Sequence, residues 1–478
     1  MPPSKIVSSF LLLLLQLSVA PVRGQTVPPH RLLVLTDIEA DPDDTQSLIR
    51  LLLYSNEIEI EGLVATTSTW MRDTIHPESI EKIIATYGQV RPNLLRHDPD
   101  FPPADALAAK VYRGLPVYGM AGVGEGKDSE GSDRLIELLK RPDDRPLYVS
   151  VWGGVNVLAQ ALYTIRETES ADEAARLIDK IRVYTISDQD DSGPWIRREF
   201  PGVFYIFSPG DYGPSTWIAI NQVVEGIDNT TISNPWLSRH IQQGHGPLGA
   251  AYPDVAWGVE GDTPAFLSLI PNGLNDPEHP DRGGWGGRYE LLIPPFDSTA
   301  APAPGVPPGA ETRPVWTDAS DSYTPYVSSE YGRAVRRGER TFEGNKVTLW
   351  RWREAFQRDF AARMDWTTQT VAEANHAPTA MLEHAENIVA RSGKGFRLSA
   401  VGSTDPDGDH LSYRWYHYPE AGTLSTTIDV TPENSASVWV TAPVTEREVT
   451  AHFILEVTDH GSPALTSYRR VIVTIQPE

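Results

Sequence analysis

Two different hydrophobic repeats follow one another along the chain. In the first part, short apolar runs alternate with stretches in which apolar residues recur every three or four positions. The apolar runs predict strands at 31–36, 58–65, 147–152, 181–186 and 203–207. The other stretches predict helices at 43–54, 77–90, 130–140, 154–165 and 213–223. Such alternation indicates an α/β domain, a mainly parallel sheet covered by helices on both faces.

The C-terminal part of the chain changes to a period of two. An amphipathic segment at 346–366 predicts a last helix that packs back on the α/β domain. After 375–378, five short alternating segments predict an all-β sandwich of immunoglobulin-like or PKD-like type: 396–403, 411–418, 437–443, 450–459 and 468–476. We therefore expect an α/β domain at 26–370 and a sandwich at 376–478, and we expect the first to remain folded without the second.

The segment between these two patterns is poor in periodic structure. Residues 271–340 are rich in Pro, Gly, Asp and Ser, and 300–314 read AAPAPGVPPGAETRP. Such composition is typical of turns and irregular loops. We expect no regular element at 300–314.

The N-terminus and the composition predict where the protein acts. Residues 1–24 combine one early Lys5, an apolar run at 10–17 and small residues near Ala20 and Gly24, the layout of a secretory signal peptide. The run is too short to span a membrane. Asn229-Thr230-Thr231 is an acceptor triplet for N-glycosylation. These features predict a secreted, extracellular glycoprotein.

Charge and cysteine content narrow the partners further. The chain has 478 residues, a formal net charge of −23 and no Cys. Anionic partners such as nucleic acids and membrane surfaces are therefore unfavourable, whereas neutral carbohydrates are compatible. Because no disulfide can form, stability must come from core burial, with bound metal as a further contribution.

The strongest chemical signal is the acidic stretch within RLLVLTDIEADPDDTQSLIR at 31–50. Five carboxylates (Asp37, Glu39, Asp41, Asp43 and Asp44) lie where a predicted strand ends and a helix begins. This edge of a parallel sheet is where α/β proteins bind ligands. Repulsion among so many carboxylates favours their neutralisation by a hard, oxygen-bound cation such as Ca²⁺. Helix capping is the alternative, but it accounts only for the last two acids.

These residues resemble the N-terminal signature of nucleoside hydrolases, D-x-D-P-G-x-D-D. Asp37 and Glu39 match its first two acids, and Asp43 and Asp44 match its last pair. The closer similarity is to a secreted nucleoside hydrolase-like family that is often labelled cellulose-binding. That similarity recurs at ISDQDDSGPWIRREFPGVFYI, GGWGGRYE and the C-terminal tail.

The resemblance implies a role for each matched residue. One Ca²⁺ ion would be held by Asp37, Asp44, Asp262 and the carbonyl of Val155, which lies in a WGGVN segment. Glu39 would be the catalytic base that activates water, and Asp43 would bind a sugar hydroxyl. Gly261 stands where the family has a His that assists leaving-group departure. Without the resemblance, Asp262 fits equally well as a helix cap before Pro264.

A second polar cluster follows the strand predicted at 181–186. It contains Asp188, Gln189, Trp195, Arg197 and Glu199. Carboxylates, an amide and a guanidinium beside an indole suit recognition of sugar hydroxyls, with the sugar stacked on the ring. Asp188 and Glu199 are candidate general acids. A solvated loop explains the same residues, and Pro201 replaces the Asn that the family has there.

Other candidate sugar contacts are scattered along the chain. They are Trp70, Asn156, His245, Trp285 and Arg288. His245 and the last two lie in glycine-rich segments that let a backbone approach a ligand closely, although one buried Trp in Gly-rich turns is an ordinary structural feature. In the sandwich, Asp405, Asp407 and Asp409 fit either a Ca²⁺ site or a capped turn, and we favour the turn.

These observations predict a secreted, Ca²⁺-dependent hydrolase that cleaves a glycosidic bond in a glycoside or glycan, plausibly a furanoside. The retained acids favour catalysis. The missing His and the additional sandwich favour the alternative, a non-catalytic protein that binds a polysaccharide such as cellulose. A nucleoside N-ribohydrolase is the third hypothesis.

Overall fold

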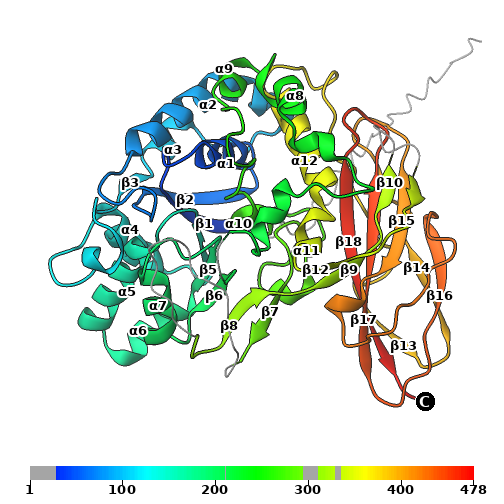
Figure 1. Cartoon of the computed structure of the whole chain (residues 1–478). Helices are drawn as coiled ribbons and strands as arrows, with labels where there is room; N and C mark the ends of the chain where they lie inside the picture. Colours follow the sequence, from blue (N-terminus) through cyan, green and yellow to red (C-terminus); the bar gives the residue numbers. More distant parts are fainter. Residues whose placement is uncertain (1–27, 210–211, 294–310, 329–334) are drawn as a thin grey trace, which may run out of the picture.

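One large, mostly parallel sheet organises the N-terminal domain (Figure 1). A computed structural model of the chain describes residues 28–209, 212–293, 311–328 and 335–478, so the predicted signal segment and 300–310 lie outside the described residues. The strand order is β3-β2-β1-β4-β5-β6-β8-β7, and only the β7–β8 pair is antiparallel. The strands are β1 (His30–Thr36), β2 (Ile58–Ala65), β3 (Val111–Arg113), β4 (Leu147–Val151), β5 (Ile181–Thr185), β6 (Phe204–Phe207), β7 (Tyr289–Leu292) and β8 (Val315–Asp318).

Burial on both faces explains the uninterrupted apolar run at residues 32–35 of β1. Along β1, Leu32 and Val34 enter one hydrophobic cluster, whereas Leu33 and Leu35 enter the other. Because successive side chains point to opposite faces, a strand covered on both sides needs apolar residues at every position. The run therefore identified a central strand.

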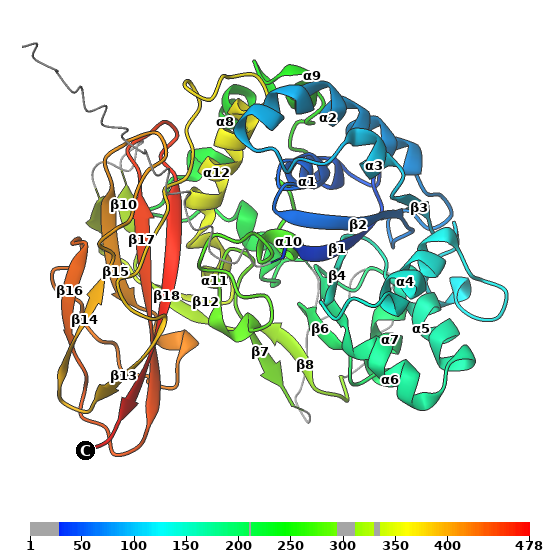
Figure 2. The same cartoon turned by 180° about the vertical axis from the view of Figure 1, so that it is seen from behind.

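The helices form a layer on each face of the sheet (Figures 1 and 2). One cluster joins the sheet to α1 (Asp43–Leu52), α2 (Pro77–His97), α3 (Ala104–Ala108), α9 (Gly246–Ala250), α10 (Pro264–Leu267), α11 (Val347–Trp350) and α12 (Arg353–Asp365). The other joins it to α4 (Glu130–Lys140), α5 (Asn156–Thr168), α6 (Ala171–Asp179) and α7 (Ser192–Glu199). The short α8 (Asn234–Leu237) lies next to α9 in sequence. No helix in the described ranges has both the length and the apolarity needed to cross a bilayer.

The predicted α/β architecture is confirmed, with differences in individual elements. All five predicted strands are present, and α4 has the predicted bounds. The helix predicted at 213–223 is wrong, because only a 3₁₀ turn forms there, at Trp217–Asn221. The segment 346–366 contains two helices separated at Arg351–Trp352. Sequence patterns missed α6, α7 and the short strands between 289 and 344.

These missed strands depend on partners that are distant in sequence. Strand β8 pairs with β6 only at Ile206↔Trp316, so its place is set by long-range packing. Two small antiparallel ladders follow, formed by β9 (Asp321–Tyr323) with β12 (Phe342–Gly344), and by β10 (Tyr326–Ser328) with β11 (Val335–Arg337).

The C-terminal region is the expected β-sandwich. A four-stranded sheet in the order β13-β18-β17-β15 faces a two-stranded sheet, β14-β16, across its own hydrophobic cluster. The strands are β13 (Asn387–Arg391), β14 (Gly395–Ser399), β15 (Ser412–His417), β16 (Ser437–Thr441), β17 (Val449–Thr458) and β18 (Thr466–Gln476). All its pairs are antiparallel except β13–β18.

The two domains share a buried interface (Figure 2). Tyr418, Ile454 and Tyr468 of the sandwich belong to the same hydrophobic cluster as the α/β core. Trp285 and Trp352 contact the Tyr468 ring edge-on, with centroids 6.3 and 5.8 Å apart. The expectation that the α/β domain stands alone is therefore unsupported, because losing the sandwich would expose this apolar surface.

We predict that a chain ending at Glu373 melts at a lower temperature than the full chain and aggregates. Within the full chain, Tyr468→Ala should lower the free energy of unfolding by about 3–5 kcal/mol, since it removes a large ring that is 1 % exposed. Thermal unfolding measures both effects. The matched control is Trp439→Ala, because Trp439 belongs to the same domain but is 69 % exposed. An unchanged melting temperature of the shortened chain would show that the interface contributes no stability.

Candidate functional site

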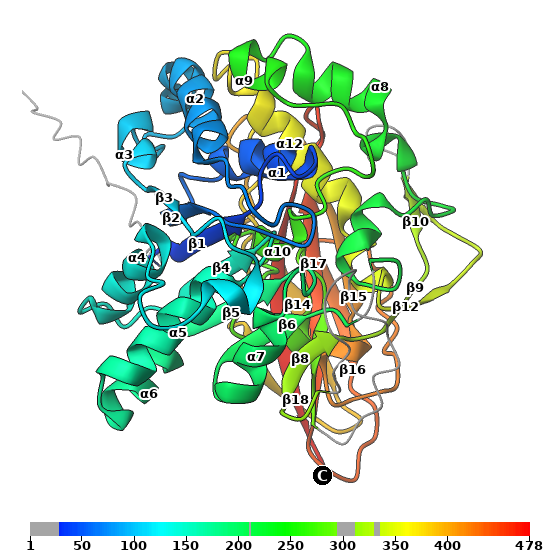
Figure 3. The same ribbon diagram turned by 60° about the vertical axis from the view of Figure 1, so that its left-hand side comes forward.

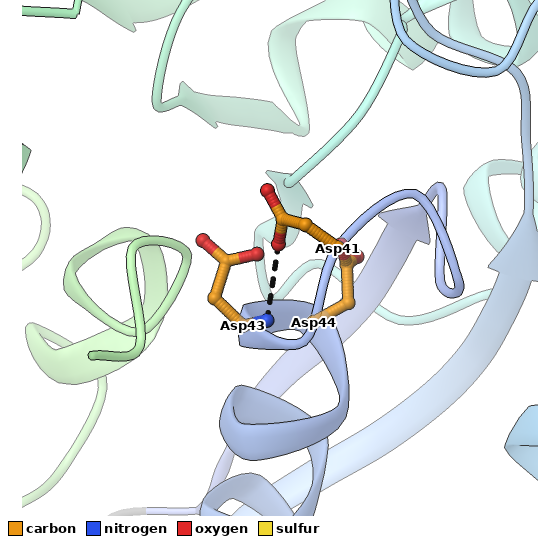
Figure 4. Close-up of side chains that lie close together, drawn as sticks. All are labelled: Asp41, Asp43 and Asp44. Atoms are coloured by element: carbon orange, nitrogen blue, oxygen red, sulfur yellow. Dashed lines mark hydrogen bonds between the residues drawn. The ribbon is translucent and has the colours of Figure 1, made fainter. Parts of the chain in front are cut away.

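A cluster of carboxylates lies at the carboxyl edge of β1. Asp41, Asp43 and Asp44 stand at the start of α1, and each offers a carboxylate oxygen within 4.8 Å of those of the other two (Figure 4). Asp41 Oδ1 accepts a hydrogen bond from the backbone N–H of Asp43 at 3.1 Å. Asp37, directly after β1, and Asp262, just before α10, interact electrostatically with these acids. We call these five residues the acid cluster.

Asp262 gives the acid cluster an unsatisfied acceptor. Its side chain is 2 % exposed, and its Oδ2 atom has no hydrogen-bond partner among the described residues. Asp44 is 3 % exposed and accepts the hydroxyl hydrogen of Thr36. A buried carboxylate oxygen without a donor is costly, and a bound cation would remove that cost.

Burial and repulsion from neighbouring acids raise the pKa values of four residues of the acid cluster, Asp37, Asp43, Asp44 and Asp262. Burial raises the pKa of Asp37 to about 7, although a hydrogen bond with Ser68 opposes the shift. Burial, and then the neighbouring acids, hold the pKa values of Asp43, Asp44 and Asp262 well above their usual range. The charged forms are therefore unfavourable unless positive charge is supplied.

Glu39 lies outside the acid cluster, contrary to its predicted role as the water-activating base. Its φ is +83°, a conformation rare for residues other than glycine. Its exposed side chain accepts a hydrogen bond from Ser79 Oγ of α2 at 2.6 Å. Asp41, to which the resemblance gave no role, lies with Asp43 and Asp44 instead. The sequence showed five acids but not the turn that separates Glu39 from the others.

Two glycines allow the acid cluster to pack. A Cβ at Gly153, after β4, would lie 2.6 Å from Asp37 Oδ1. A Cβ at Gly261 would lie 2.5 Å from Asp43 Oδ2 and 3.1 Å from the Trp217 ring. A His at 261 therefore does not fit this arrangement. The carbonyl of Val155, the fourth predicted ligand, accepts the N–H of Ala159 at 3.1 Å and retains a second lone pair.

A row of aromatic rings stands beside the acids. Trp70 is 55 % exposed and donates from Nε1 to the Tyr212 hydroxyl at 2.6 Å. Tyr212 packs edge-on against Trp217, with ring centroids 5.4 Å apart. Burial and the nearby Asp37, Asp41 and Asp262 raise the pKa of Tyr212. Trp70 was a predicted sugar contact. Trp217 was missed because the pattern predicts a helix at 213–223, and Tyr212, which directly precedes that segment, was not singled out.

The two candidate general acids are occupied elsewhere. Arg197 binds both carboxylate oxygens of Asp188, at 2.8 and 2.7 Å. Glu199 pairs with Arg166 at 3.6 Å, and Arg166 lies ten residues along α5 from Asn156, about 15 Å along the helix axis. The guanidinium of Arg166 also lies 5.5 Å from the Trp195 ring. Neither acid is therefore placed in the acid cluster, and Trp195 offers no ring to it.

Two other predicted contacts stabilise loops near the site. Asn156 accepts from Thr66 Oγ1 and donates to the Val117 carbonyl, both at 2.8 Å. Gln189 donates from Nε2 to the Trp152 carbonyl at 2.5 Å, and its buried Oε1 has no partner in the described part of the chain. Both side chains are buried, so the structure gives them positioning contacts.

The remaining candidates lie in the protein core or between the domains. His245 pairs through Nε2 with Asp365 at 3.0 Å and joins α9 to α12. Arg288 binds Asp321, and Trp285 packs between Phe356 and Tyr468. None of the three contacts the acid cluster, because long-range packing places each of them elsewhere.

The glycosylation triplet and the acidic turn of the sandwich both have side chains that are hydrogen-bonded within the protein. Asn229 of the glycosylation triplet donates from Nδ2 to Val224 at 2.7 Å and accepts from Arg353 at 2.8 Å. Attaching a glycan to Nδ2 would disturb these contacts in the folded chain. Asp405 Oδ1 accepts the N–H groups of Asp407 and Asp409, both at 2.9 Å, as a capped turn requires.

Comparisons with known proteins match both domains. Residues 31–289 match the family described as cellulose-binding Sde182, nucleoside hydrolase-like domain, and residues 395–475 match the cellulose-binding protein Sde0182, C-terminal domain. A solved nucleoside hydrolase-related hypothetical protein from Saccharophagus degradans, associated with carbohydrate metabolism, is 34% identical. The alignment covers 94% of this chain and 100% of that chain, with a TM-score of 0.78.

Other similarities are weaker. The effector protein XOO4466 is 11% identical over 60% of this chain and 87% of that chain, with a TM-score of 0.33, too low to indicate a shared fold. No curated protein matches the chain.

We predict that Gly153→Ala weakens Ca²⁺ binding about tenfold or more, because the added methyl group displaces Asp37. Isothermal titration calorimetry measures the affinity. Gly202→Ala is the control, since a Cβ at Gly202 meets no atom within 4 Å. Equal affinities of the two variants would show that Asp37 is not needed for the cation.

The pH dependence of stability should depend on Ca²⁺. The pKa of Asp37 is about 7 in the folded chain, well above its ordinary value of 3.8. Without a cation, the protonated form therefore stabilises the fold at low pH, and this contribution disappears as pH rises towards about 7. The melting-temperature gain from Ca²⁺ over chelator should therefore grow from about pH 5 to about pH 8. In the Asp44→Asn variant, the melting-temperature gain from Ca²⁺ should not grow with pH. A gain that is independent of pH in the wild type would contradict cation binding by Asp37 and its neighbours.

Proposed function

Since the chain belongs to the family of cellulose-binding proteins with a nucleoside hydrolase-like domain, we propose that its α/β domain recognises a polysaccharide through a Ca²⁺ ion held by the acid cluster. The observation that carries this proposal is the buried, unpartnered Oδ2 of Asp262 among four further carboxylates. Carboxylate oxygens are the ligands that Ca²⁺ prefers.

The residues of the acid cluster divide into two groups by exposure. Asp37, Asp44 and Asp262 are buried and suit cation ligands. Asp41 and Asp43 are partly exposed and suit contacts with sugar hydroxyls. Bound Ca²⁺ would supply the charge that offsets carboxylate repulsion and would leave coordination positions for vicinal hydroxyls.

The aromatic row supports a carbohydrate ligand. The exposed Trp70 ring offers an apolar surface beside the acids, and its hydrogen bond with Tyr212 fixes its orientation. A sugar has both an apolar face and a hydroxyl rim, so an indole next to a cation site matches both. We further propose that the protein is secreted. Calcium in the extracellular space is abundant enough for modules of modest affinity.

Hydrolysis of an O-glycosidic bond is the second candidate function, and Asp41 favours it. Its carboxylate is partly exposed and lies beside Asp43, so it would be the base that accepts a proton from water. Asp188 and Glu199, the expected proton donors for the leaving group, are paired with Arg197 and Arg166. We therefore rank recognition before catalysis.

Nucleosides should be poor substrates in either case. Departure of a base requires protonation or strong hydrogen bonding of the leaving group. Gly261 lacks a suitable side chain, and Asp43 and Trp217 fill the space that a His at 261 would need.

We predict that the wild-type protein binds one Ca²⁺ ion and sediments with insoluble cellulose or another wall polysaccharide in Ca²⁺ but not in chelator. Asp44→Asn should abolish both properties at about millimolar Ca²⁺ while the fold persists, because an amide retains the shape and removes the charge. The control is Asp133→Asn on α4, an exposed carboxylate that is not part of the acid cluster. Polysaccharide binding that is unaffected by chelator and by Asp44→Asn would overturn the proposal.

The same samples should be tested for turnover of glycans, aryl furanosides and inosine. Release of product that requires both Ca²⁺ and Asp41 would establish the second candidate function. Rapid inosine hydrolysis would restore the nucleosidase hypothesis.

A further inference from the structure

A groove of about 480 Å³ lies beside the acid cluster, between α1, α2 and α9. These three helices are neighbours at one end of the α/β domain (Figures 1 and 3). Its lining includes Glu39, Ser79, Lys82, Ile83, Pro247 and Ala250. This volume is in the range of small-molecule sites.

The lining combines two kinds of surface. Ile83, Pro247 and Ala250 provide an apolar wall of modest size. Glu39, Ser79 and Lys82 provide a carboxylate, a hydroxyl and an ammonium group, so both donors and acceptors are present. A neutral, hydroxylated ligand can bond to both the donors and the acceptors, whereas an anion would be repelled by Glu39 and a cation would be repelled by Lys82.

The backbone at Glu39 directs this side chain to the groove. Its φ of +83° is an unusual conformation for a residue with a Cβ, and such outliers gather at functional sites. The Ser79 hydroxyl, 2.6 Å from Glu39 Oε1, then holds the carboxylate against α2. The turn that removes Glu39 from the acid cluster therefore places it in the neighbouring groove.

The groove is continuous in sequence with the acid cluster. Glu39 is flanked by Asp37 and Asp41 at two residues' distance, and Thr45 of the groove follows Asp44. Two lining residues of the groove therefore lie within two positions of the acid cluster in the chain.

We propose that the groove is a second sugar subsite, which binds a neighbouring unit of a neutral polysaccharide whose first unit lies at the acid cluster. This inference rests on the proposed function and adds that the ligand is an extended chain. Glu39 and Lys82 would bind hydroxyls of the second unit, and neither would bind the cation.

The test is calorimetry with a monosaccharide and with cello-oligosaccharides of increasing length in Ca²⁺, together with a Ca²⁺ titration. Wild-type affinity should rise with oligosaccharide length. Glu39→Gln and Lys82→Ala should each lose most of that rise, about tenfold for the longer ligands, and should keep wild-type affinity for Ca²⁺. Glu125→Gln, on an exposed loop before α4, is the matched control and should behave as wild type.

The outcomes separate the two proposals. If Ca²⁺ and the shortest sugar bind but longer ligands bind no better, the groove is not a subsite and the proposed function stands. If the variants retain the length dependence, the assignment of these residues is wrong. If Glu39→Gln loses Ca²⁺ as Asp44→Asn does, Glu39 is a cation ligand and the inference fails. If neither Ca²⁺ nor any sugar binds, the proposed function itself fails.

Discussion

Electrostatic repulsion among five carboxylates at the end of β1 is the constraint on which the site depends. Burial raises the pKa values of Asp37, Asp43, Asp44 and Asp262, and repulsion from neighbouring acids, Asp41 among them, adds to the effect. The surrounding chain preserves this costly arrangement. Gly153 and Gly261 leave room for two of the acids. Burying these acids together destabilises the chain unless they are protonated or a cation offsets their charge.

The domain interface supports the site indirectly. The last strand of the sandwich packs through Tyr468 against Trp285 and Trp352, and Trp352 precedes α12. Helix α12 in turn binds α9 through the His245–Asp365 pair, and α9 forms one wall of the groove. Contacts of the C-terminal domain therefore support the position of α9, which lines the groove, through α12.

Much of the fold was predictable, because its central strands have a simple physical requirement. A strand covered on both faces is apolar at most of its positions, as residues 32–35 of β1 and residues 204–207 of β6 are, whereas β2 and β5 also carry charged residues near their start. Among the site residues, Asp37, Asp43, Asp44 and Asp262 do come together. The sequence did not predict the position of the Glu39 side chain, because that position depends on one positive φ angle. It also did not predict the roles of Tyr212 and Trp217, because no α-helix forms around them.

The sequence by itself determined the order of the elements and the edge where the acids gather, because local periodicity and strand direction fix both. Tertiary structure alone decided which of many polar residues face that edge. Trp285, Arg288 and His245 carry plausible chemistry in the sequence, yet packing between distant segments buries them in the core and the domain interface. Asp188 and Glu199 are likewise bound by arginines. Local sequence does not encode such contacts, since each depends on a partner from a distant segment or on the packing of neighbouring helices.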